Sequence, residues 1–175
     1  MRNIVLIGMM GSGKTSIGKI VAKKVNYTFL DTDTMIEQDQ GCTIEDIFFY
    51  AGEDFFRKLE TLTLNNLLKK KRIVLATGGG IIKTEGNLDI LKQIGKVYFL
   101  NNDPDIMFQR AVQSDKRPLL KNSNNKVEDY MKIYNERLQF YMQADTVLKN
   151  DTQDKSKMVT LLLDDFYTAR INESI

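Results

Sequence analysis

The chain has 175 residues, of which 42% are hydrophobic and 27% are charged, and its formal net charge is +2. This length suits one domain with a sizeable core, and so small a charge gives no reason to expect nucleic-acid binding. The sequence contains no histidine, which excludes histidine metal sites, Ser-His triads and histidine general bases. A single cysteine excludes an internal disulfide and fits a reducing cytoplasm. No apolar run approaches the roughly 20 residues of a membrane span, and we expect a cytoplasmic protein without a signal peptide.

The first two predicted elements enclose a glycine-rich loop. Residues 3–7 (NIVLI) predict a buried strand, and apolar side chains at helical spacing predict a helix over 14–25. Between them, residues 8–15 (GMMGSGKT) fit the pattern G-x-x-x-x-G-K-[ST] of a phosphate-binding loop. Backbone N–H groups of such a loop and the N-terminus of the helix form a cradle for a polyphosphate; the alternative is a glycine-rich turn with an incidental lysine. The predicted ATP-binding residues are Gly11, Ser12, Gly13, Lys14, Thr15 and Ser16, with Lys14 at the β- and γ-phosphates and Thr15 as a Mg²⁺ ligand.

Two aspartates follow the second predicted strand, residues 28–31. The strand ends in Asp31, Thr32 and Asp33. In open α/β sheets, ligands bind at the carboxyl ends of the strands, and side chains two residues apart on a strand share a face. We therefore expect both carboxylates to face one cleft. The alternative is a polar turn whose aspartate caps a helix over 34–40.

A long helical region follows, interrupted at Gly52. A short helix begins after Thr43, a favourable N-cap residue, and a longer helix is expected over about 53–70. On the longer helix, Arg57 and Glu60 are three residues apart and can pair. The alternative for Arg57 is a surface ion pair that stabilises the fold by less than about 1 kcal/mol.

A third buried strand is predicted at 73–77, and three glycines, Gly78, Gly79 and Gly80, follow it at once. Consecutive glycines serve no packing purpose and lose much conformational entropy on folding. We interpret them as a place where the backbone approaches a ligand closely. A loose connection between elements is the alternative.

The stretch 113–125 differs from its surroundings because it is polar and rich in asparagine. It contains Arg117, followed by the rigid and apolar run Pro118, Leu119 and Leu120. We interpret the stretch as a mobile loop that holds one anchored motif. The alternative is a disordered surface insertion.

Strands and helices alternate along the chain, which predicts an α/β protein with a parallel sheet of five strands. No internal repeat or linker divides it, so one domain is expected. The remaining predicted elements are helices at 84–94, from 104, at 126–142 and at 155–167, and strands at 96–100 and 145–149.

Several motifs spread over the chain are specific in combination. They are GMMGSGKT at 8–15, FLDTD at 29–33, TIEDIF at 43–48, GEDFFRKLE at 52–60, TGGG at 77–80, RPLL at 117–120 and RLQFYMQAD at 137–145. The first motif alone is shared by many nucleotide-binding proteins, whereas D-T-D, F-R-x-x-E, G-G-G and a late arginine together are not. In this order, and over nearly the whole chain, the motifs resemble the shikimate kinase family.

The resemblance implies a three-layer α/β/α fold of the P-loop kinase type, with a five-stranded parallel sheet in the order 2-3-1-4-5. It implies a single kinase domain over 1–175, with a substrate-binding helical segment at about 33–60 and a lid at about 113–125. The implied reaction transfers the γ-phosphoryl group of ATP to the 3-hydroxyl of shikimate, giving shikimate 3-phosphate and ADP, in chorismate and aromatic amino-acid biosynthesis. Mg²⁺ is the implied cofactor. We expect a monomer that binds shikimate and ATP, and neither nucleic acid nor a membrane.

The resemblance also implies roles for single residues. Arginine can offer a planar fork to the shikimate carboxylate, which lysine cannot. Phosphoryl transfer depends mostly on positioning and charge neutralisation, so a chain without histidine can perform it. The implied catalytic residues are Lys14, Asp33 and Arg117, the last in the lid. The implied shikimate-binding residues are Asp33, Phe48, Phe56, Arg57, Gly78, Gly79, Gly80 and Arg137; Thr15 and Asp31 hold Mg²⁺; Arg110 and Arg117 contact ATP, Arg110 near the adenine.

Two other functions stay open at this point. One is another small-metabolite kinase of the same architecture, such as a gluconate kinase, which would share the loop at 8–15 but not the F-R-x-x-E and G-G-G motifs. The other is a module that binds a nucleotide without acting on a metabolite; guanine-specific switches carry N-K-x-D, which this sequence lacks. The chain also departs from the shikimate kinases at 150–155, which has neither the proline nor the arginine that often packs on adenine.

Overall fold

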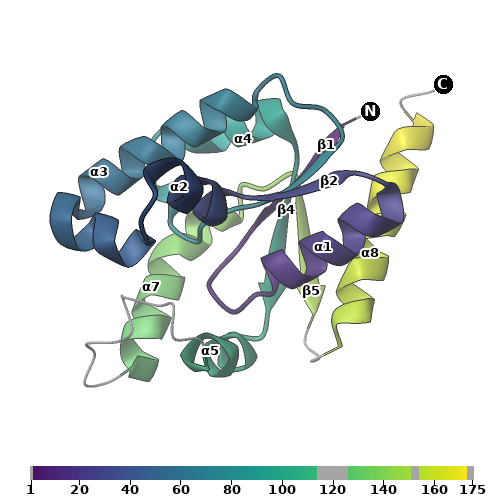
Figure 1. Cartoon of the computed structure of the whole chain (residues 1–175). Helices are drawn as coiled ribbons and strands as arrows, with labels where there is room; N and C mark the ends of the chain where they lie inside the picture. The colour runs from purple at the N-terminus through teal and green to yellow at the C-terminus, as the bar shows by residue number, and fades with distance from the viewer. Residues whose placement is uncertain (1, 114–125, 151–153, 173–175) are drawn as a thin grey trace.

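The computed structural model describes residues 2–113, 126–150 and 154–172, without the side chains of 170–172. The predicted lid at 113–125, apart from Gln113, and with it Arg117 lie outside the described residues. The described residues form three layers, a sheet between two sets of helices (Figure 1). The prediction of an α/β/α fold is therefore confirmed.

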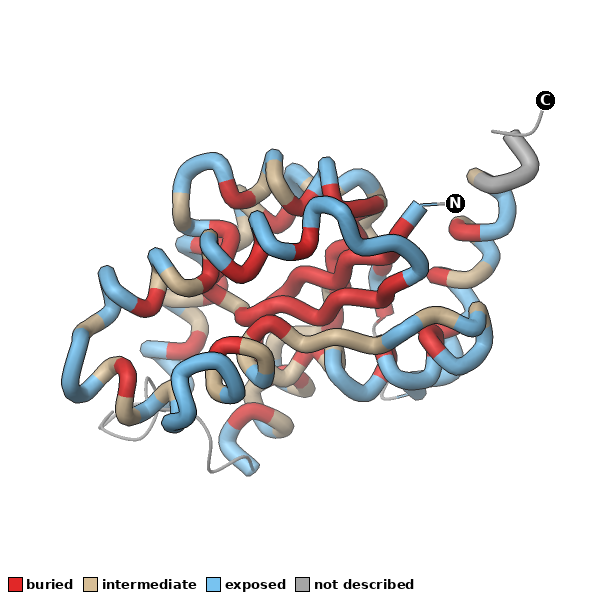
Figure 2. The backbone as a smooth tube through the Cα atoms, turned by 45° about the horizontal axis from the view of Figure 1, so that its top comes forward, coloured by how far each residue is buried: buried red, intermediate tan, exposed pale blue. Residues whose placement is uncertain are grey.

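Five strands form the central sheet. They are β1 Asn3–Ile7, β2 Thr28–Asp31, β3 Ile73–Ala76, β4 Gly95–Asn102 and β5 Thr146–Asn150. All pairs are parallel, and the order is β2-β3-β1-β4-β5, as expected. The inner strands are almost entirely buried on both faces, which is typical of a parallel sheet between helices (Figure 2).

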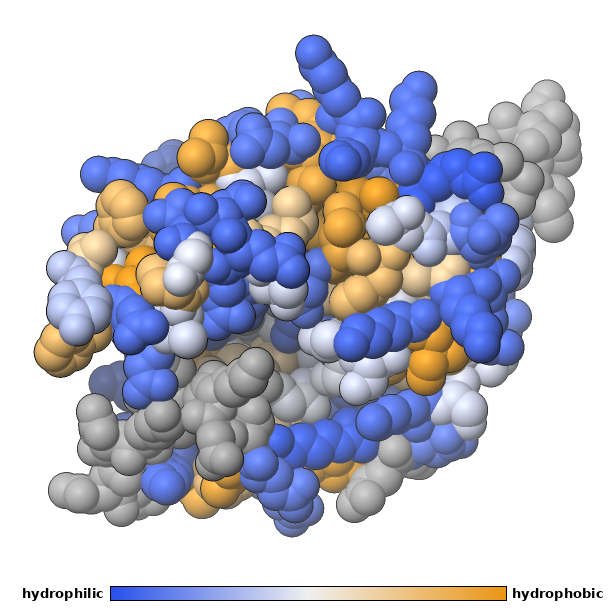
Figure 3. Space-filling model, viewed as in Figure 1, coloured by the Kyte–Doolittle hydropathy of each residue, from blue (hydrophilic) through white to orange (hydrophobic). Residues whose placement is uncertain are grey.

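Helices cover both faces of the sheet and enclose two hydrophobic cores. The helices are α1 Lys14–Val25, α2 Thr32–Gln40, α3 Ile44–Leu67, the 3₁₀ turn η1 Ile81–Lys83, α4 Asn87–Ile94, α5 Pro104–Val112, α7 Lys126–Tyr141 and α8 Lys155–Asn172. Alternate residues of β1 face opposite cores, because Ile4 and Leu6 pack with α1 and α8, and Val5 and Ile7 with α3, α4 and α7. On the side of the molecule shown in Figure 3, hydrophilic side chains are interspersed with smaller hydrophobic patches. None of the helices in the described ranges is both long and apolar enough to cross a bilayer.

Two helices begin at other residues than predicted. The helix predicted at 34–40 begins at Thr32, because the Asp31 side chain caps it and accepts a hydrogen bond from the Asp33 N–H at 3.1 Å. The helix predicted from 84 begins only at Asn87. Gly86, with φ 81°, separates it from the turn η1.

The predicted interruption at Gly52 is confirmed: α3 consists of two helical stretches that meet at a kink at this residue. Gly52 has φ 81° and ψ 172°, a conformation that glycine adopts far more readily than other residues. Thr43 and Asp46 form a capping box at the start of α3, with each side chain bonding the other residue's N–H at 3.1 Å. Residues 41–43 connect α2 to α3, and this connection contains the exposed Cys42.

Candidate active site

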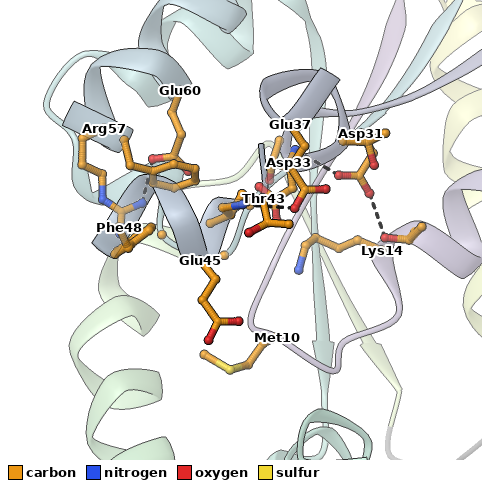
Figure 4. A pocket seen from close by; sticks show the side chains of 18 of the residues that line it. Met10, Lys14, Asp31, Asp33, Glu37, Thr43, Glu45, Phe48, Arg57 and Glu60 are labelled. Atoms are coloured by element: carbon orange, nitrogen blue, oxygen red, sulfur yellow. Dashed lines mark hydrogen bonds and ion pairs between the residues drawn. The ribbon is translucent and has the colours of Figure 1, made fainter. Parts of the chain in front are cut away.

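A cavity of about 550 Å³ opens at the carboxyl edge of the sheet (Figure 4). Its walls come from the loop after β1, the ends of β2 and β3, and the helices α2, α3 and α7. Figure 4 shows Arg57 and Glu60 at one side, Lys14 and Asp31 at the other, and Asp33 between them. The predicted site residues that line the cavity are Lys14, Thr15, Asp31, Asp33, Phe48, Phe56, Arg57, Gly78, Gly79, Gly80 and Arg137.

The remaining predicted residues are not among the described residues that line this cavity. Arg110 lies in the last turn of α5, and Arg117 is outside the described residues. Gly11, Ser12, Gly13 and Ser16 belong to the loop and first turn of α1 that flank the lining residues. Lining residues that the sequence analysis did not assign to the site are Met10, Thr34, Glu37, Thr43, Ile44, Glu45, Glu60 and Thr77. Three of them, Thr43, Ile44 and Glu45, belong to the TIEDIF motif, which was the sequence signal that could have identified them.

Residues of α5 and β4 pack closely against the phosphate-binding loop. A Cβ atom on Gly11 would lie 2.0 Å from the carbonyl oxygen of Met107 on α5, and the φ of 82° also favours glycine there. Asn102, at the end of β4, donates from Nδ2 to the carbonyl oxygen of Ser12 at 2.7 Å. Contacts from two distant elements therefore hold the shape of this loop.

Lys14 lies across its own loop. Its Nζ donates to the carbonyl oxygens of Gly8 and Met9 at 2.7 and 3.0 Å. These acceptors are neutral, and a phosphate oxygen is a stronger acceptor for an ammonium group. The geometry therefore allows Lys14 to exchange its backbone partners for an anionic ligand.

Thr15 and Asp31 meet where α1 and the end of β2 border the cavity. The Thr15 hydroxyl donates to Asp31 Oδ2 at 2.9 Å, and Asp31 Oδ1 accepts from the Asp33 N–H. A hydroxyl beside a carboxylate is an oxygen donor set that suits Mg²⁺, which binds few protein ligands and keeps several waters. The described residues hold no group of three or more His, Cys, Asp or Glu side chains placed for a metal ion. The two residues therefore fit a partly hydrated Mg²⁺ better than a metal enclosed by protein.

Asp31 and Asp33 do line one cavity, but the predicted reason is wrong. Asp31 ends β2, whereas Asp33 lies in the first turn of α2, so the alternation of side chains on a strand does not apply. The alternative, a helix cap, is correct for Asp31. One carboxylate thus combines the cap of α2 with a contact to Thr15.

Arg57 is held by two carboxylates of its own helix. Nη1 bonds Glu60 Oε2 at 2.7 Å, and Nη2 bonds Glu53 Oε1 at 2.6 Å. The Arg57 and Glu60 side chains are only 15% and 0% exposed, so the interpretation as a surface ion pair is wrong. Burial raises the pKa of Glu60 to about 7, although Arg57 opposes the shift. Glu60 Oε1 accepts no hydrogen bond from any described residue.

The glycines after β3 make room for side chains of the site. A Cβ atom on Gly78 would lie 2.6 Å from Asp33 Oδ1, and one on Gly80 would lie 2.6 Å from Arg57 Nη2. A loose connection is therefore the wrong interpretation, and so is the view that these glycines serve no packing purpose. They let a carboxylate and a guanidinium approach the backbone.

The far wall of the cavity combines charge and apolar surface. Arg137 on α7 is buried, and its Nη1 would lie 3.4 Å from a Cβ atom on Gly79. Phe48 and Phe56 have ring centroids 4.9 Å apart and together form an apolar surface. This wall thus suits a small ligand with an anionic group and a carbon ring.

A family model described as shikimate kinase matches residues 10–166. The chain belongs to the shikimate kinase family. Shikimate kinases from Caldicellulosiruptor bescii and Thermodesulfovibrio yellowstonii are 38% and 41% identical to it, over 86% and 83% of this chain and 87% and 83% of those proteins. The solved structure of the Acinetobacter baumannii shikimate kinase in complex with shikimate matches with a TM-score of 0.91 and 34% identity, over 97% of this chain and 94% of that one.

Membership of the shikimate kinase family confirms what the motifs implied. The prediction of an ATP-dependent kinase that acts on shikimate is confirmed, and neither a gluconate kinase nor a non-catalytic nucleotide-binding module is favoured. The roles of single residues stay predictions.

Proposed function

We propose that the chain transfers the γ-phosphoryl group of ATP to the 3-hydroxyl of shikimate within the cavity, with ATP held by the loop at 8–15 and shikimate by α2, α3 and α7. One observation carries this assignment of the two substrates to two sides of the cavity: Arg57 and Arg137 line the same cavity as Lys14. Two planar guanidinium groups suit the single carboxylate of shikimate. The Acinetobacter baumannii relative was solved with shikimate, which supports an equivalent site here.

On the shikimate side, Arg57 keeps donors for the carboxylate. Of its five N–H groups, its bonds to Glu53 and Glu60 use one each on Nε, Nη1 and Nη2, so each terminal nitrogen has one left within the described residues. Arg137 supplies a second guanidinium, and Asp33 accepts hydrogen bonds from the hydroxyls. Gly79 and Gly80 offer backbone N–H groups, and Phe48 and Phe56 contact the ring. Gly78 lines the same wall, with its own N–H bonded to the Thr32 hydroxyl at 2.9 Å.

On the ATP side, the loop amides of Gly11 and Gly13 and the first residues of α1, including Ser16, face the phosphates. Ser12 lies between the two glycines, and its N–H bonds the carbonyl oxygen of Met9 at 3.1 Å. Lys14 leaves the carbonyl oxygens of its loop and binds the β- and γ-phosphates. Thr15 and Asp31 would hold Mg²⁺. Bound there, the ion would neutralise charge on the phosphates. Arg110 contacts the adenine side, and Arg117 reaches the phosphates from a lid at about 113–125.

The reaction needs alignment more than a strong base. The 3-hydroxyl oxygen bonds to the γ-phosphorus as the bond to the bridging β–γ oxygen breaks, and ADP leaves with the electron pair of that bond. Asp33 orients the hydroxyl and takes its proton. Lys14 and Arg117 neutralise the charge on the transferring group.

We also propose that one chain is sufficient and that it works in the cytoplasm with Mg²⁺. The proposed shikimate ligands all come from a single chain, which supports an active monomer. The exposed thiol of Cys42 supports a reducing compartment.

An assay of ADP release with and without shikimate tests the function, with gluconate as the matched competitor. We expect release to depend on shikimate and on added Mg²⁺, and ³¹P NMR to place the product phosphate on the 3-hydroxyl. Equal release with gluconate, or a phosphate on another hydroxyl, would overturn the proposal. Size-exclusion chromatography with light scattering during turnover tests the monomer.

A further inference from the structure

The buried residues of α7 lie in one stripe, at Tyr130, Tyr134, Arg137 and Tyr141. The steps of four, three and four residues place them on one face of the helix. Arg137 lines the cavity, whereas the three tyrosines do not. The tyrosines are therefore placed to act on the cavity through the backbone around it.

Two of the hydroxyls reach the loops that are proposed to bind the two substrates. Tyr130 donates to the carbonyl oxygen of Met10 in the phosphate-binding loop at 2.9 Å. Tyr141 donates to the carbonyl oxygen of Gly79 in the glycine run at 2.5 Å. Both tyrosines are fully buried, and burial raises the pKa of Tyr141 to about 12, so its hydroxyl stays a donor at neutral pH. One helix thus anchors the backbone of both loops.

Each anchored carbonyl determines where the next N–H points. The described residues contain no cis peptide bond, so the C=O of Met10 and the N–H of Gly11 point in opposite directions, as do the C=O of Gly79 and the N–H of Gly80. The hydroxyls bond from the α7 side, and the two amides therefore point away from it. Neither amide donates a hydrogen bond to a described residue, so each can serve a ligand.

The anchors matter because glycine alone does not fix these peptide planes. Rotation of a peptide plane changes ψ of the residue before it and φ of the residue after it. Gly79 and Gly80 tolerate both signs of φ, and Gly11 already lies at φ 82°. The peptide planes at these two places have little conformational preference of their own. The hydrogen bond from a buried hydroxyl therefore fixes the orientation of each plane.

We propose that Tyr130 and Tyr141 are positioning residues that aim one amide donor at each substrate, the Gly11 N–H at a phosphate of ATP and the Gly80 N–H at shikimate. This inference rests on the proposed function, which states which loop meets which substrate. Because both tyrosines belong to α7, the helix also fixes the two donors relative to each other and to Arg137.

Phenylalanine variants keep the ring and remove only the hydroxyl. Because the Tyr141 hydroxyl also hydrogen-bonds Arg137, the affinities of its variant are judged together with the Gly80 amide resonance described below. Tyr141→Phe should raise the Kd and KM of shikimate about three- to tenfold and leave those of ATP within about twofold, and Tyr130→Phe should do the reverse. Tyr134→Phe is the matched control, because its hydroxyl bonds the side chain of Asn101 at 3.2 Å and no loop carbonyl. Calorimetry with shikimate and with a non-hydrolysable ATP analogue measures the affinities.

Amide NMR of the wild type adds a measurement that needs no variant. Shikimate should shift the Gly80 N–H resonance strongly and the ATP analogue the Gly11 resonance, each with little effect on the other. A wild type without shikimate-dependent ADP release would show that the proposed function is wrong. If the wild type is active, but the variants lose affinity for both ligands equally or for neither, or the two amides do not respond, the tyrosines only support the fold and this inference is overturned.

Discussion

The two halves of the cavity hold their cations in different ways. In the nucleotide half, Lys14 Nζ bonds neutral carbonyl oxygens of its own loop. In the acceptor half, Arg57 is held by the carboxylates of Glu53 and Glu60. In the proposed function, Lys14 changes partners when ATP binds, whereas Arg57 keeps its partners and offers the N–H groups that remain. We therefore expect the first half to adapt to its ligand and the second to be organised before its ligand arrives.

The origin of each half in the chain explains this difference. The nucleotide half is one continuous loop, 8–15, whose conformation follows from its glycines and the helix after it. The acceptor half combines Asp33, Arg57, Gly80 and Arg137, which come from four segments far apart in the chain. Tertiary contacts bring such groups together, and here Asp33, Arg57 and Arg137 each pack against one of the glycines that follow β3.

Lys14 gives the largest expected effect and tests the adaptable half. Lys14→Met removes the charge that neutralises the transferring group, so kcat should fall by at least about 10²–10³-fold. The apolar stem remains, so thermal unfolding followed by circular dichroism should stay near that of the wild type. Turnover within a few-fold of the wild type would remove Lys14 from the reacting groups.

Glu60 should make the acceptor half sensitive to pH. Its pKa rises from an ordinary value of 4.5 to about 7, so the folded state holds a proton that the unfolded state has lost between these values. The stability from this group is fully present below about pH 4.5 and is lost as pH rises through 7, by up to about 3 kcal/mol.

Urea unfolding of the wild type and Glu60→Gln between about pH 5 and pH 8 measures this contribution. The difference in the free energy of unfolding between the two proteins should change steadily over that range. Glu53→Gln is the matched control, because its carboxylate also binds Arg57 but is 50% exposed. A difference that does not vary with pH would contradict the assignment to Glu60.

Replacing Arg57 or Arg137 by lysine should weaken the binding of shikimate much more than the binding of ATP. Each change replaces a planar fork by a point charge, and the loss of a charge-assisted hydrogen bond costs about 1.5–3 kcal/mol of shikimate binding. ATP binding should change little. Calorimetry with both ligands measures the split, and the exposed Arg72→Lys serves as control. An equal loss of ATP affinity would place these arginines in the nucleotide half.

Arg117 should act on both halves at once, with the smallest of these effects. If it neutralises the transferring group from a lid, Arg117→Ala lowers kcat by at least about tenfold, or roughly 1.4 kcal/mol, and spares shikimate affinity. Lys121→Ala in the same stretch is the control. Limited proteolysis within 113–125 should also slow when ATP and shikimate are both present. An unchanged kcat with a cleavage rate that ignores ligands would make the stretch an ordinary surface loop.

The comparison also explains what could be predicted from the sequence. The strands, the loop between β1 and α1, and the glycine break in α3 depend on local chemistry, and these predictions are confirmed. The burial of Glu60 and the crowding of Gly78 and Gly80 by Asp33 and Arg57 depend on segments that meet only in the folded chain. The three-residue spacing of Arg57 and Glu60 is the same in an exposed ion pair and in a buried one.

The tyrosines of α7 illustrate the same limit. Tyr130, Tyr134 and Tyr141 have the sequence spacing of one helix face, and all three are buried. The spacing of side chains predicts a face, but it does not identify the acceptor of a hydroxyl. Those acceptors belong to Met10, Asn101 and Gly79, at least 33 residues away.

The connection between α2 and α3 offers a way to watch ligands arrive. Cys42 is exposed and is the single cysteine of the chain, and the next residue, Thr43, lines the cavity. A maleimide dye will therefore label one known position beside the cavity without any mutation. Stopped-flow fluorescence of the labelled protein can then time the arrival of shikimate and of ATP separately from product formation.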